Sequence, residues 1–445
     1  MKPEEVLSLI TEKAKQHNVD QFDTMVLQSE DFSVEVFQKA VKGTEMSFSQ
    51  GAGIRLFKDG RPGYSHSERF TKEAISQMVD DAVSLATLTD PLQFDLPTEE
   101  TKPDQQALDR FDNELEGLEL DNFVTFAKNM EEVAYAAGEP IENVPMSAAG
   151  RSSSQSWFLN SNGVNFHQKR NKFSAAVELV VEKKSQKKSA YGYDSSPQWG
   201  TITPEELVKR AKERSERLLG ASPIESQSIP IVLSNRVSGS LISMFLSAFY
   251  AESAQKGQSR LADKLGKQVA ASHLSLYVDP TDKALPGHKV FDSEGVLCQE
   301  VPMVENGVLQ TLLYNLESAS KAKVAPTGNG VRSYKGSAST GISNLIMPAG
   351  QATIQEMLNS YPKILLVEQL EGGAGCSAVS GEISIGVQGQ LIEQGTVSRP
   401  VDGVTMNGNF FDLLLAIESA SDAYAPEWKA VKIPDLLIKS MEIAG

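Results

Sequence analysis

Apolar residues recur every three to four positions in several segments, a spacing that places them on one face of a helix. The first such face comes from four residues near the N-terminus, Val6, Leu7, Ile10 and Ala14. The same spacing predicts further helices over residues 72–86, 120–137, 204–220, 238–254 and 410–417. The helix at 204 has the clearest start, because Thr203-Pro204-Glu205-Glu206 combines a capping box with a proline at the first helical position.

Other segments alternate apolar and polar residues, which is the pattern of half-buried strands. The alternation is clear at residues 32–36 and 175–181, and Asp59-Gly60 and Asn162-Gly163 predict hairpin turns. The last half of the chain consists mostly of short β-rich stretches, at 229–233, 274–278, 301–304, 363–367, 383–387 and 436–443. Within it, Asn306-Gly307 and Gln388-Gly389 are predicted turns.

Strands outnumber crossover helices in the C-terminal half, which favours a curled antiparallel sheet over a doubly wound one. The predicted fold class is therefore α+β, with an N-terminal mixed α/β domain and a C-terminal domain dominated by a curled antiparallel β-sheet. The proline-rich, acidic and aperiodic stretch at 91–103 predicts a boundary. The predicted domains are residues 1–95, a middle α/β segment at 104–222 that is either separate or merged with the first, and residues 223–445.

Composition narrows the classes of function. The 445 residues carry a formal net charge of −16, which argues against a nucleic-acid partner because phosphate contacts need clustered Lys and Arg. Two cysteines, Cys298 and Cys376, favour a reducing compartment. No signal peptide is expected at the N-terminus, and the longest apolar stretch, at 241–251, is too short to span a bilayer. We therefore expect a cytoplasmic protein without a membrane partner.

The histidines do not form a recognisable metal motif. A catalytic zinc usually needs two histidines about one helical turn apart, and no two of the five histidines are that close in sequence. Neither HExxH nor HExxxH occurs. We expect no metal bound by this chain.

Two glycine-rich loops and one acidic pair are the remaining candidates. Residues 327–330 and 372–375 form either tight turns or places where a peptide backbone approaches closely. Asp292 and Glu294 could bind a cation or an amine, or could form a polar turn between strands. Cys376 has no neighbouring histidine in sequence, although a neighbour in space stays open.

Many short phrases of the chain resemble, in order, the TldD/PmbA family. Residues 51–57, Gly51-Ala52-Gly53-Ile54-Arg55-Leu56-Phe57, and the following Asp59-Gly60-Arg61-Pro62-Gly63 look like the opening signature of that family. The C-terminal half continues the resemblance with Val278-Asp279-Pro280, Val304-Glu305-Asn306-Gly307, Ile392-Glu393-Gln394-Gly395 and Gly408-Asn409. The resemblance covers almost the whole chain.

The resemblance implies a two-subunit, cytoplasmic metallopeptidase that cuts unfolded peptides and leader segments. Its TldD-type subunit carries HExxxH on a helix and a further cysteine ligand near the C-terminus. The corresponding helix here, at 238–254, has no histidine, and residues 422–433 have no cysteine. Both departures are features of the PmbA (TldE) branch, whose members are also labelled modulators of DNA gyrase. The resemblance thus implies no catalytic residue and no cofactor in this chain, with zinc only in a TldD-type partner.

We therefore predict a PmbA/TldE-like, non-catalytic subunit that shapes a peptide-binding cavity together with a TldD-type metallopeptidase subunit. An extended peptide could add as a strand to an exposed sheet edge. The predicted peptide-binding residues are Asp292, Glu294, Asn329, Gly372, Gly373, Ser380 and Glu382. Two alternatives stay open: a stand-alone enzyme that uses Cys376 or the Asp292/Glu294 pair, and a homodimeric peptide-binding or regulatory protein without a protease partner.

Overall fold

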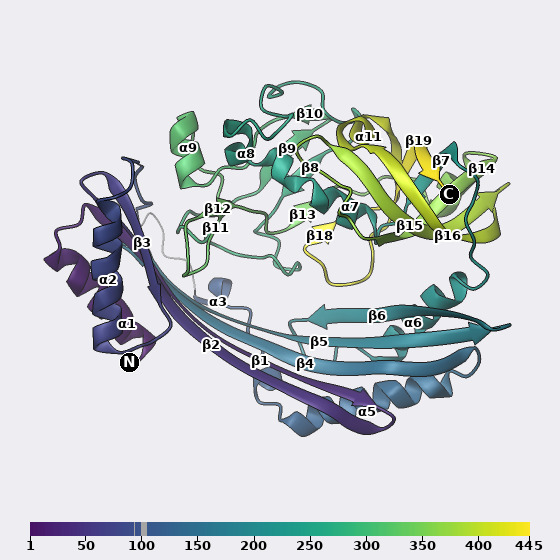
Figure 1. Ribbon diagram of the computed structural model, residues 1–445, viewed down its shortest axis with the longest axis horizontal. Helices are drawn as coiled ribbons and strands as arrows, with labels where there is room; N and C mark the ends of the chain where they lie inside the picture. The colour runs from purple at the N-terminus through teal and green to yellow at the C-terminus, as the bar shows by residue number, and fades with distance from the viewer. Residues whose placement is uncertain (93, 99–104) are drawn as a thin grey trace.

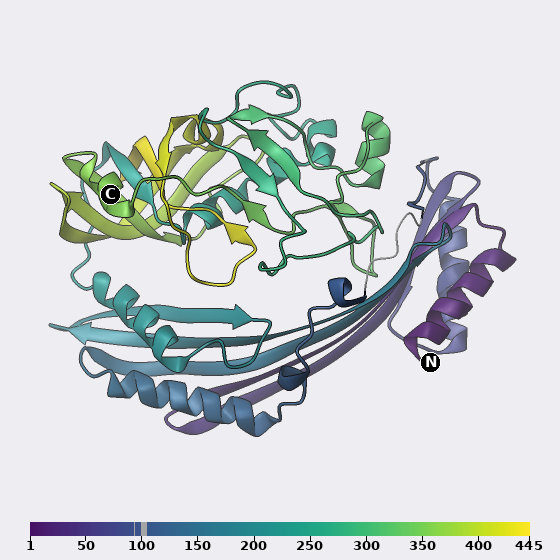
Figure 2. The same ribbon diagram turned by 180° about the vertical axis from the view of Figure 1, so that it is seen from behind.

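The computed structural model describes residues 1–92, 94–98 and 105–445. A long curled sheet made by the N-terminal half lies beneath the C-terminal half, and its concave side faces that half (Figure 1). The view from behind shows the same arrangement, with the sheet curving under the C-terminal half and helices on its outer side (Figure 2).

The curled sheet has six strands in the order β3-β2-β1-β4-β5-β6, and every neighbouring pair is antiparallel. The strand bounds are β1 Gln21–Phe37, β2 Ala40–Lys58, β3 Arg61–Ser67, β4 Ile141–Asn160, β5 Asn165–Lys183 and β6 Gln186–Ser196. Strands from before and after residues 91–103 thus belong to one sheet, so the first two predicted domains share it.

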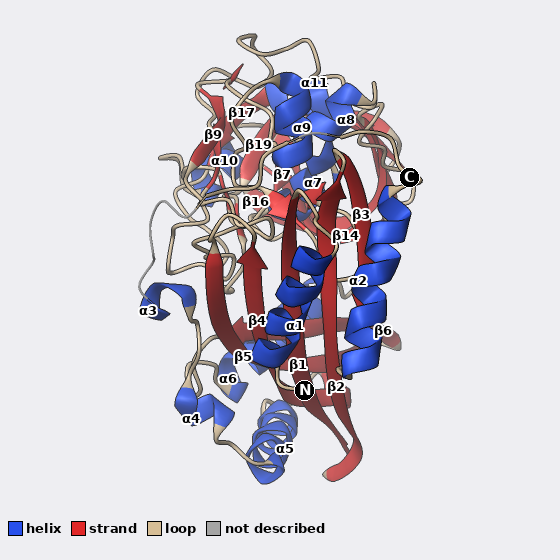
Figure 3. Ribbon diagram, turned by 90° about the vertical axis from the view of Figure 1, so that its left-hand side faces the viewer, coloured by secondary structure: helices blue, strands red, loops and turns tan. Residues whose placement is uncertain are grey.

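Helices cover the convex face of this sheet. Side chains alternate between the two faces of a strand, and the apolar ones on the convex face pack against these helices. Val26 of β1 packs against α1 and α2 at one end, and Val34 and Val36 pack against α5 and α6 at the other. Figure 3 shows α1 and α2 lying against the strands. The helices of this half are α1 Pro3–Gln16, α2 Lys72–Ala86, α3 Gln105–Leu108, α4 Asn113–Glu116, α5 Leu120–Ala136 and α6 Pro204–Arg217.

The C-terminal half is built on a second six-stranded sheet in the order β16-β15-β14-β7-β19-β17, with a further pairing of β16 and β19. Its strands are β7 Gln227–Leu233, β14 Lys363–Glu371, β15 Glu382–Glu393, β16 Thr396–Asn409, β17 Ile417–Ala420 and β19 Leu436–Ala444. The pair β7 and β14 is parallel, so this sheet is mixed.

Small strands and short helices complete this half. The small strands are β8 Leu276–Val278, β9 Val301–Glu305, β10 Val308–Leu309, β11 Gly330–Val331, β12 Ser339–Thr340, β13 Leu345–Ile346 and β18 Val431–Lys432. The helices are α7 Ser238–Met244, η1 Leu246–Phe249, α8 Ala251–Gln255, α9 Leu316–Ala322, α10 Ile354–Asn359 and α11 Phe410–Ala416.

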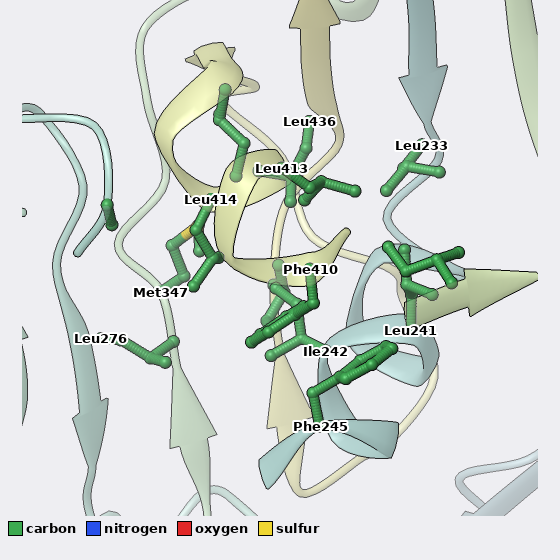
Figure 4. Packing of buried hydrophobic residues seen from close by; sticks show 14 of the residues in the cluster. Leu233, Leu241, Ile242, Phe245, Leu276, Met347, Phe410, Leu413, Leu414 and Leu436 are labelled. Atoms are coloured by element: carbon green, nitrogen blue, oxygen red, sulfur yellow. The ribbon is translucent and has the colours of Figure 1, made fainter. Parts of the chain in front are cut away.

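The core of the C-terminal half forms where α7 and α11 meet. The rings of Phe245 and Phe410 stack with centroids 4.4 Å apart, and Leu241, Leu413 and Leu414 pack around them (Figure 4). Burying these side chains is the main force that holds the short helices on the sheet, because apolar burial contributes about 1.5–3 kcal/mol for each large side chain.

The α+β class is confirmed, but the curled antiparallel sheet lies in the N-terminal half, whereas the C-terminal sheet is mixed. The helix predicted at 238–254 is broken into α7, η1 and α8. The break at Tyr250, between η1 and α8, occurs because Leu313 forms hydrogen bonds of 2.9 Å with Phe249 and Ala251, which holds Tyr250 in an extended conformation. This long-range pairing outweighs the helical preference of the segment.

The predicted turn at Asn306-Gly307 is confirmed between β9 and β10, whereas the predicted turn at Gln388-Gly389 is wrong. Gly389 lies inside β15 at a bulge, where a Cβ atom would stand 1.8 Å from the Leu366 carbonyl oxygen. This glycine permits close approach of two strands. The actual turn is Gln394-Gly395, with φ of 51° and 74°.

No helix in the described residues is both long and apolar enough to cross a membrane.

Candidate functional site

Two glycines of residues 51–57, Gly51 and Gly53, lie where the N-terminal and C-terminal halves of the molecule are in contact. Gly51, Gly53 and Arg55 share the concave face of β2, since they alternate along the strand. A Cβ atom on Gly51 would stand 2.2 Å from the ring of Tyr334, and one on Gly53 would stand 1.9 Å from the Tyr334 carbonyl oxygen. Only glycine lets the segment between β11 and β12 rest directly on β2.

A buried set of charges joins the halves beside these glycines. The Arg55 Nη1 donates to Glu294 Oε1 at 2.5 Å, and its Nε donates to Asp23 Oδ2 at 2.9 Å. Arg332 also pairs with Asp23. Burial alone lowers the pKa of Arg55, but Asp23 and Glu294 more than offset this effect and raise that pKa. Each buried charge therefore has a partner of opposite sign, as the desolvation cost requires.

Asp292 belongs to the same buried region and is not part of an ion pair in the described residues. Its carboxyl accepts the backbone N–H groups of Glu294 and Val296 at 2.9 Å and that of Gly330 at 2.8 Å. Burial first, and the charge of Glu294 second, raise the pKa of Asp292 to about 7. Its carboxyl is thus held by main-chain donors in a place where a negative charge is unfavourable.

Three of the seven predicted peptide-binding residues are therefore used inside the protein. Glu294 is buried and joins the two halves through Arg55, whereas Asp292 is buried and accepts main-chain N–H groups of the C-terminal half. Asn329 is buried, with its Nδ2 donating to the Gly341 carbonyl at 3.1 Å. We leave these three out of the proposed site. The sequence shows the two neighbouring carboxylates. It does not show that Glu294 pairs with Arg55, because the two residues are 239 positions apart.

The other four predicted residues come together on one hydrogen-bonded stretch between β14 and β15. The Cys376 N–H donates to the Gly373 carbonyl, and the Ser377 N–H donates to the Glu382 carbonyl, both at 3.0 Å. The Ser380 carbonyl accepts from Arg260 Nη1 at 3.1 Å. Gly372, Ser380 and Glu382 are exposed, so this stretch is open to a ligand.

The two cysteines have different surroundings. Cys298 is buried, its Sγ lies 3.4 Å from the Gly328 carbonyl oxygen, and burial raises the pKa of its thiol to about 12. Cys298 is therefore a packed side chain. Cys376 is half-buried, and its Sγ lies 4.0 Å from the Ser384 carbonyl oxygen.

The concave face of the curled sheet carries a groove that the sequence analysis missed. The open part of this face holds eight serines: Ser29, Ser33, Ser47, Ser49, Ser152, Ser154, Ser156 and Ser174. A cavity of about 390 Å³ lies over it and is lined by Asp31, Ser33, Ser47, Ser152, Ser174 and Tyr193, among others. We call this cavity the serine groove. The signal was present as Ser152-x-Ser154-x-Ser156, a polar repeat with the period of a strand.

The serine groove runs across the strands, because its lining residues come from β2, β1, β4, β5 and β6. Neighbouring strands are about 4.8 Å apart, so four such steps span about 19 Å, the length of about six extended residues. Small hydroxyl side chains leave room for a chain and offer donors and acceptors without selecting a particular side chain.

Ion pairs tie the far end of the curled sheet to the C-terminal half. Lys188 of β6 pairs with Asp402 of β16, and Arg217 of α6 pairs with Glu368 of β14. Together with Arg55 and Glu294 at the other end, these contacts hold the concave face under the C-terminal half.

One edge of the groove is a free strand edge. β3 pairs with β2 only over Ala52–Lys58, so the outer side of residues 40–50 of β2 has no partner strand in the described structure. Residues 40–49 are all exposed, and Met46 and Phe48 are 71% and 63% exposed. An unpaired edge of this length is a template for a further strand.

Three domain models of one protein family together match most of the chain. Residues 23–86 match PmbA/TldA metallopeptidase domain 1, residues 113–219 match the central domain, and residues 226–445 match the C-terminal domain. The chain belongs to the PmbA/TldD metallopeptidase family.

Relatives of the PmbA type align with the PmbA/TldD chain along nearly its full length. The metalloprotease PmbA homolog of Haemophilus influenzae is 25% identical over 93% of this chain and 90% of its own. The metalloprotease PmbA of Escherichia coli O157:H7 is 24% identical over 99% of this chain and 96% of its own.

Crystal structures of the family share the fold. A Thermotoga maritima protein described as a modulator of a DNA gyrase superposes with a TM-score of 0.88 at 25% identity, covering 100% of both chains. TldE from Thermococcus kodakarensis superposes with a TM-score of 0.86 at 22% identity, covering 99% of both chains.

The PmbA/TldD family implies zinc on the segment that corresponds to α7, η1 and α8. The only His, Cys, Asp or Glu within residues 238–255 is Glu252, which accepts the Thr340 N–H at 3.1 Å. Leu241, Ile242 and Phe245 of this segment point into the core (Figure 4). Across residues 1–92, 94–98 and 105–445, no three such side chains gather to hold a metal ion. This segment therefore does not fit zinc.

Proposed function

We propose that this chain is a non-catalytic, PmbA/TldE-like subunit of a heteromeric metallopeptidase, and that it binds an extended peptide beside its partner. The partner would be a TldD-type subunit that supplies the zinc. The serine groove carries this proposal, because it is a strand-lined cavity of about 390 Å³ that combines serine hydroxyls with small apolar side chains and has space for an extended chain.

Three features support the peptide as ligand. The hydroxyl-lined floor suits main-chain groups, which all peptides share. The exposed stretch with Gly372, Gly373, Ser380 and Glu382 offers backbone groups on the C-terminal half. The free edge of β2 can pair with an extended chain through main-chain hydrogen bonds, which give affinity with little sequence preference. Such a surface fits a peptidase that processes unfolded or leader peptides.

The subunit role is supported by the donor set of the segment 238–255, which has one carboxylate and no imidazole or thiol. A catalytic zinc needs about three protein ligands. We also place the protein in the cytoplasm, where its two free cysteines would stay reduced.

Metal content and assembly test the subunit role. The chain purified alone is analysed for bound zinc by elemental analysis, and is then mixed with a TldD-type subunit and sized by light scattering. The proposal expects less than about one zinc per ten chains and preferential heteromer formation. Stoichiometric zinc in the lone chain, or a homodimer that does not exchange with the TldD-type subunit, would contradict it. The second result would favour the homodimeric regulatory alternative.

A further inference from the structure

Three cationic side chains meet around one buried carboxylate near the β6 end of the serine groove. The side chain of Glu427 is 3% exposed. Arg214 Nη2 lies 2.6 Å from Glu427 Oε1, and Arg236 Nη2 lies 3.4 Å from the same oxygen. Lys429 Nζ lies 4.0 Å from Glu427 Oε2. We call Arg214, Arg236 and Lys429 the basic cluster.

The neighbouring carboxylates are paired with other cations and offset only part of the positive charge of this cluster. Arg210 pairs with both Asp194 and Glu206, and Arg217 pairs with Glu368. The basic cluster has three positive charges against the single negative charge of Glu427, an excess of two, which falls to one when the second carboxylate beside Arg210 is counted. Such an excess stands out in a chain whose net charge is −16.

Donors and acceptors in the cluster are not satisfied by the protein itself. Arg214 Nε and Glu427 Oε2 are buried and have no hydrogen-bond partner in the described structure. The guanidinium of Arg236 makes no hydrogen bond or ion pair other than its 3.4 Å ion pair with Glu427 in the described part of the chain. Burial first, and repulsion from Arg214 and Arg236 as well, lower the pKa of Lys429. A bound anion would relieve this repulsion.

The cluster adjoins the groove through β6. Arg214 Nη1 donates to the Tyr191 carbonyl at 2.6 Å. Tyr191 lies two residues before Tyr193, which lines the serine groove, so both side chains occupy the same face of β6. The cations are partly exposed, with 28% of the Arg236 side chain and 41% of the Lys429 side chain accessible.

We infer that the basic cluster binds a carboxylate of the peptide held in the serine groove. This inference rests on the proposed function. The guanidinium group presents a planar fork of N–H donors that matches the two oxygens of a carboxylate, and Lys429 adds a compact charge beside it. The carboxylate is either the C-terminal group of the peptide or an acidic side chain, and both present the same two oxygens.

Peptide binding to the full chain tests this inference. The probes are three fluorescein-labelled Ser/Ala decapeptides: one with a free C-terminal carboxylate, its C-terminal amide, and the amide with a single internal Glu. Fluorescence anisotropy at low ionic strength gives the affinity of each, because exposed charges are screened by salt. The variants are Arg236→Gln and Lys429→Gln. Lys209→Gln removes one exposed charge from the same helix as Arg214 and serves as the matched control.

The expected result is that wild type binds a carboxylate-bearing peptide about tenfold more tightly than the plain amide, the scale of one charge-assisted hydrogen bond. This preference should vanish in Arg236→Gln and Lys429→Gln and persist in Lys209→Gln. Preference for the free acid assigns the C-terminal carboxylate, and preference for the internal Glu assigns the side chain. Equal binding of all three peptides by wild type overturns the inference but leaves the proposed function standing. No binding of any peptide overturns both.

Discussion

Arg55 on the concave face of β2 donates to Glu294 of the C-terminal half at 2.5 Å, across 239 residues of sequence. This contact and the nearby glycines fix one end of the curled sheet under the C-terminal half. The opposite end is fixed by the ion pairs of β6 and α6. The serine groove lies between these two attachments, so its shape depends on both.

Removing the Arg55 guanidinium should destabilise the protein strongly. In Arg55→Met, the carboxylates of Asp23 and Glu294 stay buried, and both lose a partner. Breaking a buried pair in this way costs about 3–5 kcal/mol. Urea unfolding followed by tryptophan fluorescence measures the change. The exposed pair of Lys42 and Glu35 supplies the control, because Lys42→Ala should change stability by less than about 1 kcal/mol. Equal effects of the two variants would refute the assigned role of Arg55.

Gly53→Ala should loosen the contact between β2 and the segment at Tyr334. The new Cβ would stand 1.9 Å from the Tyr334 carbonyl oxygen, and a backbone atom cannot move away as cheaply as a side chain. We expect a loss of about 1–3 kcal/mol, the usual cost of overpacking, and faster tryptic cleavage at Arg332 and Lys335. Gly43→Ala on the same strand has open space around its Cβ and should cost little. A Gly53→Ala protein as resistant to trypsin as Gly43→Ala would contradict this account.

The stability of the protein should depend on Asp292 as pH changes. Its pKa is about 7 in the folded protein, against an ordinary value of 3.8. The folded state therefore holds the proton more tightly, and the contribution of Asp292 to stability is lost as pH rises from about 4 to about 7. Asp292→Asn cannot ionise, so its stability relative to wild type should rise over this window and level off above it. A difference between the two proteins that is constant from pH 4 to pH 8 would show that Asp292 does not titrate there.

Filling the serine groove should weaken peptide binding without unfolding the chain. Ser33→Trp places a large side chain in the cavity, whereas Gln28→Trp places the same side chain on the opposite face of the same strand. We expect at least a tenfold loss of affinity for an unfolded peptide in Ser33→Trp, together with unchanged circular dichroism, and little change in Gln28→Trp. If both variants bind like wild type, the peptide lies outside the groove.

The elements that the sequence predicted correctly are those with strong local signals. The helix at 204 has its proline and its Thr203 cap, whose side chain accepts the Glu206 N–H, and the turns at Asp59-Gly60 and Asn306-Gly307 have residues that favour positive φ. The resemblance of residues 51–57 to a family signature was also a local signal, and the family is confirmed.

The features that escaped prediction depend on contacts between distant segments. The break at Tyr250 follows from the pairing of Leu313 with Phe249 and Ala251, which no local preference reveals. Gly389 looks like a turn residue in sequence but serves close packing in β15. The serine face of β4 was not predicted, because alternating polar residues on a strand have the same pattern whether they face solvent or line a cavity.

The residues predicted to bind a peptide differ in the same way. Gly372, Gly373, Ser380 and Glu382 were predicted from the sequence to bind a peptide. The structure places all four on one exposed stretch. The role of Glu294 could not be predicted, because a carboxylate in a turn looks the same whether it faces water or a buried arginine. Only the fold places Arg55 beside it.

Cleavage of an unfolded peptide by the separate and mixed subunits tests the central claim most directly. The chain alone, a TldD-type subunit alone and the mixture are each assayed with and without a zinc chelator, using the same labelled peptide. The account predicts that this chain cleaves nothing by itself and that the mixture cleaves faster than the TldD-type subunit in a chelator-sensitive way. Cleavage by the isolated chain, with or without chelator, would show that it has a catalytic site of its own and would contradict the account.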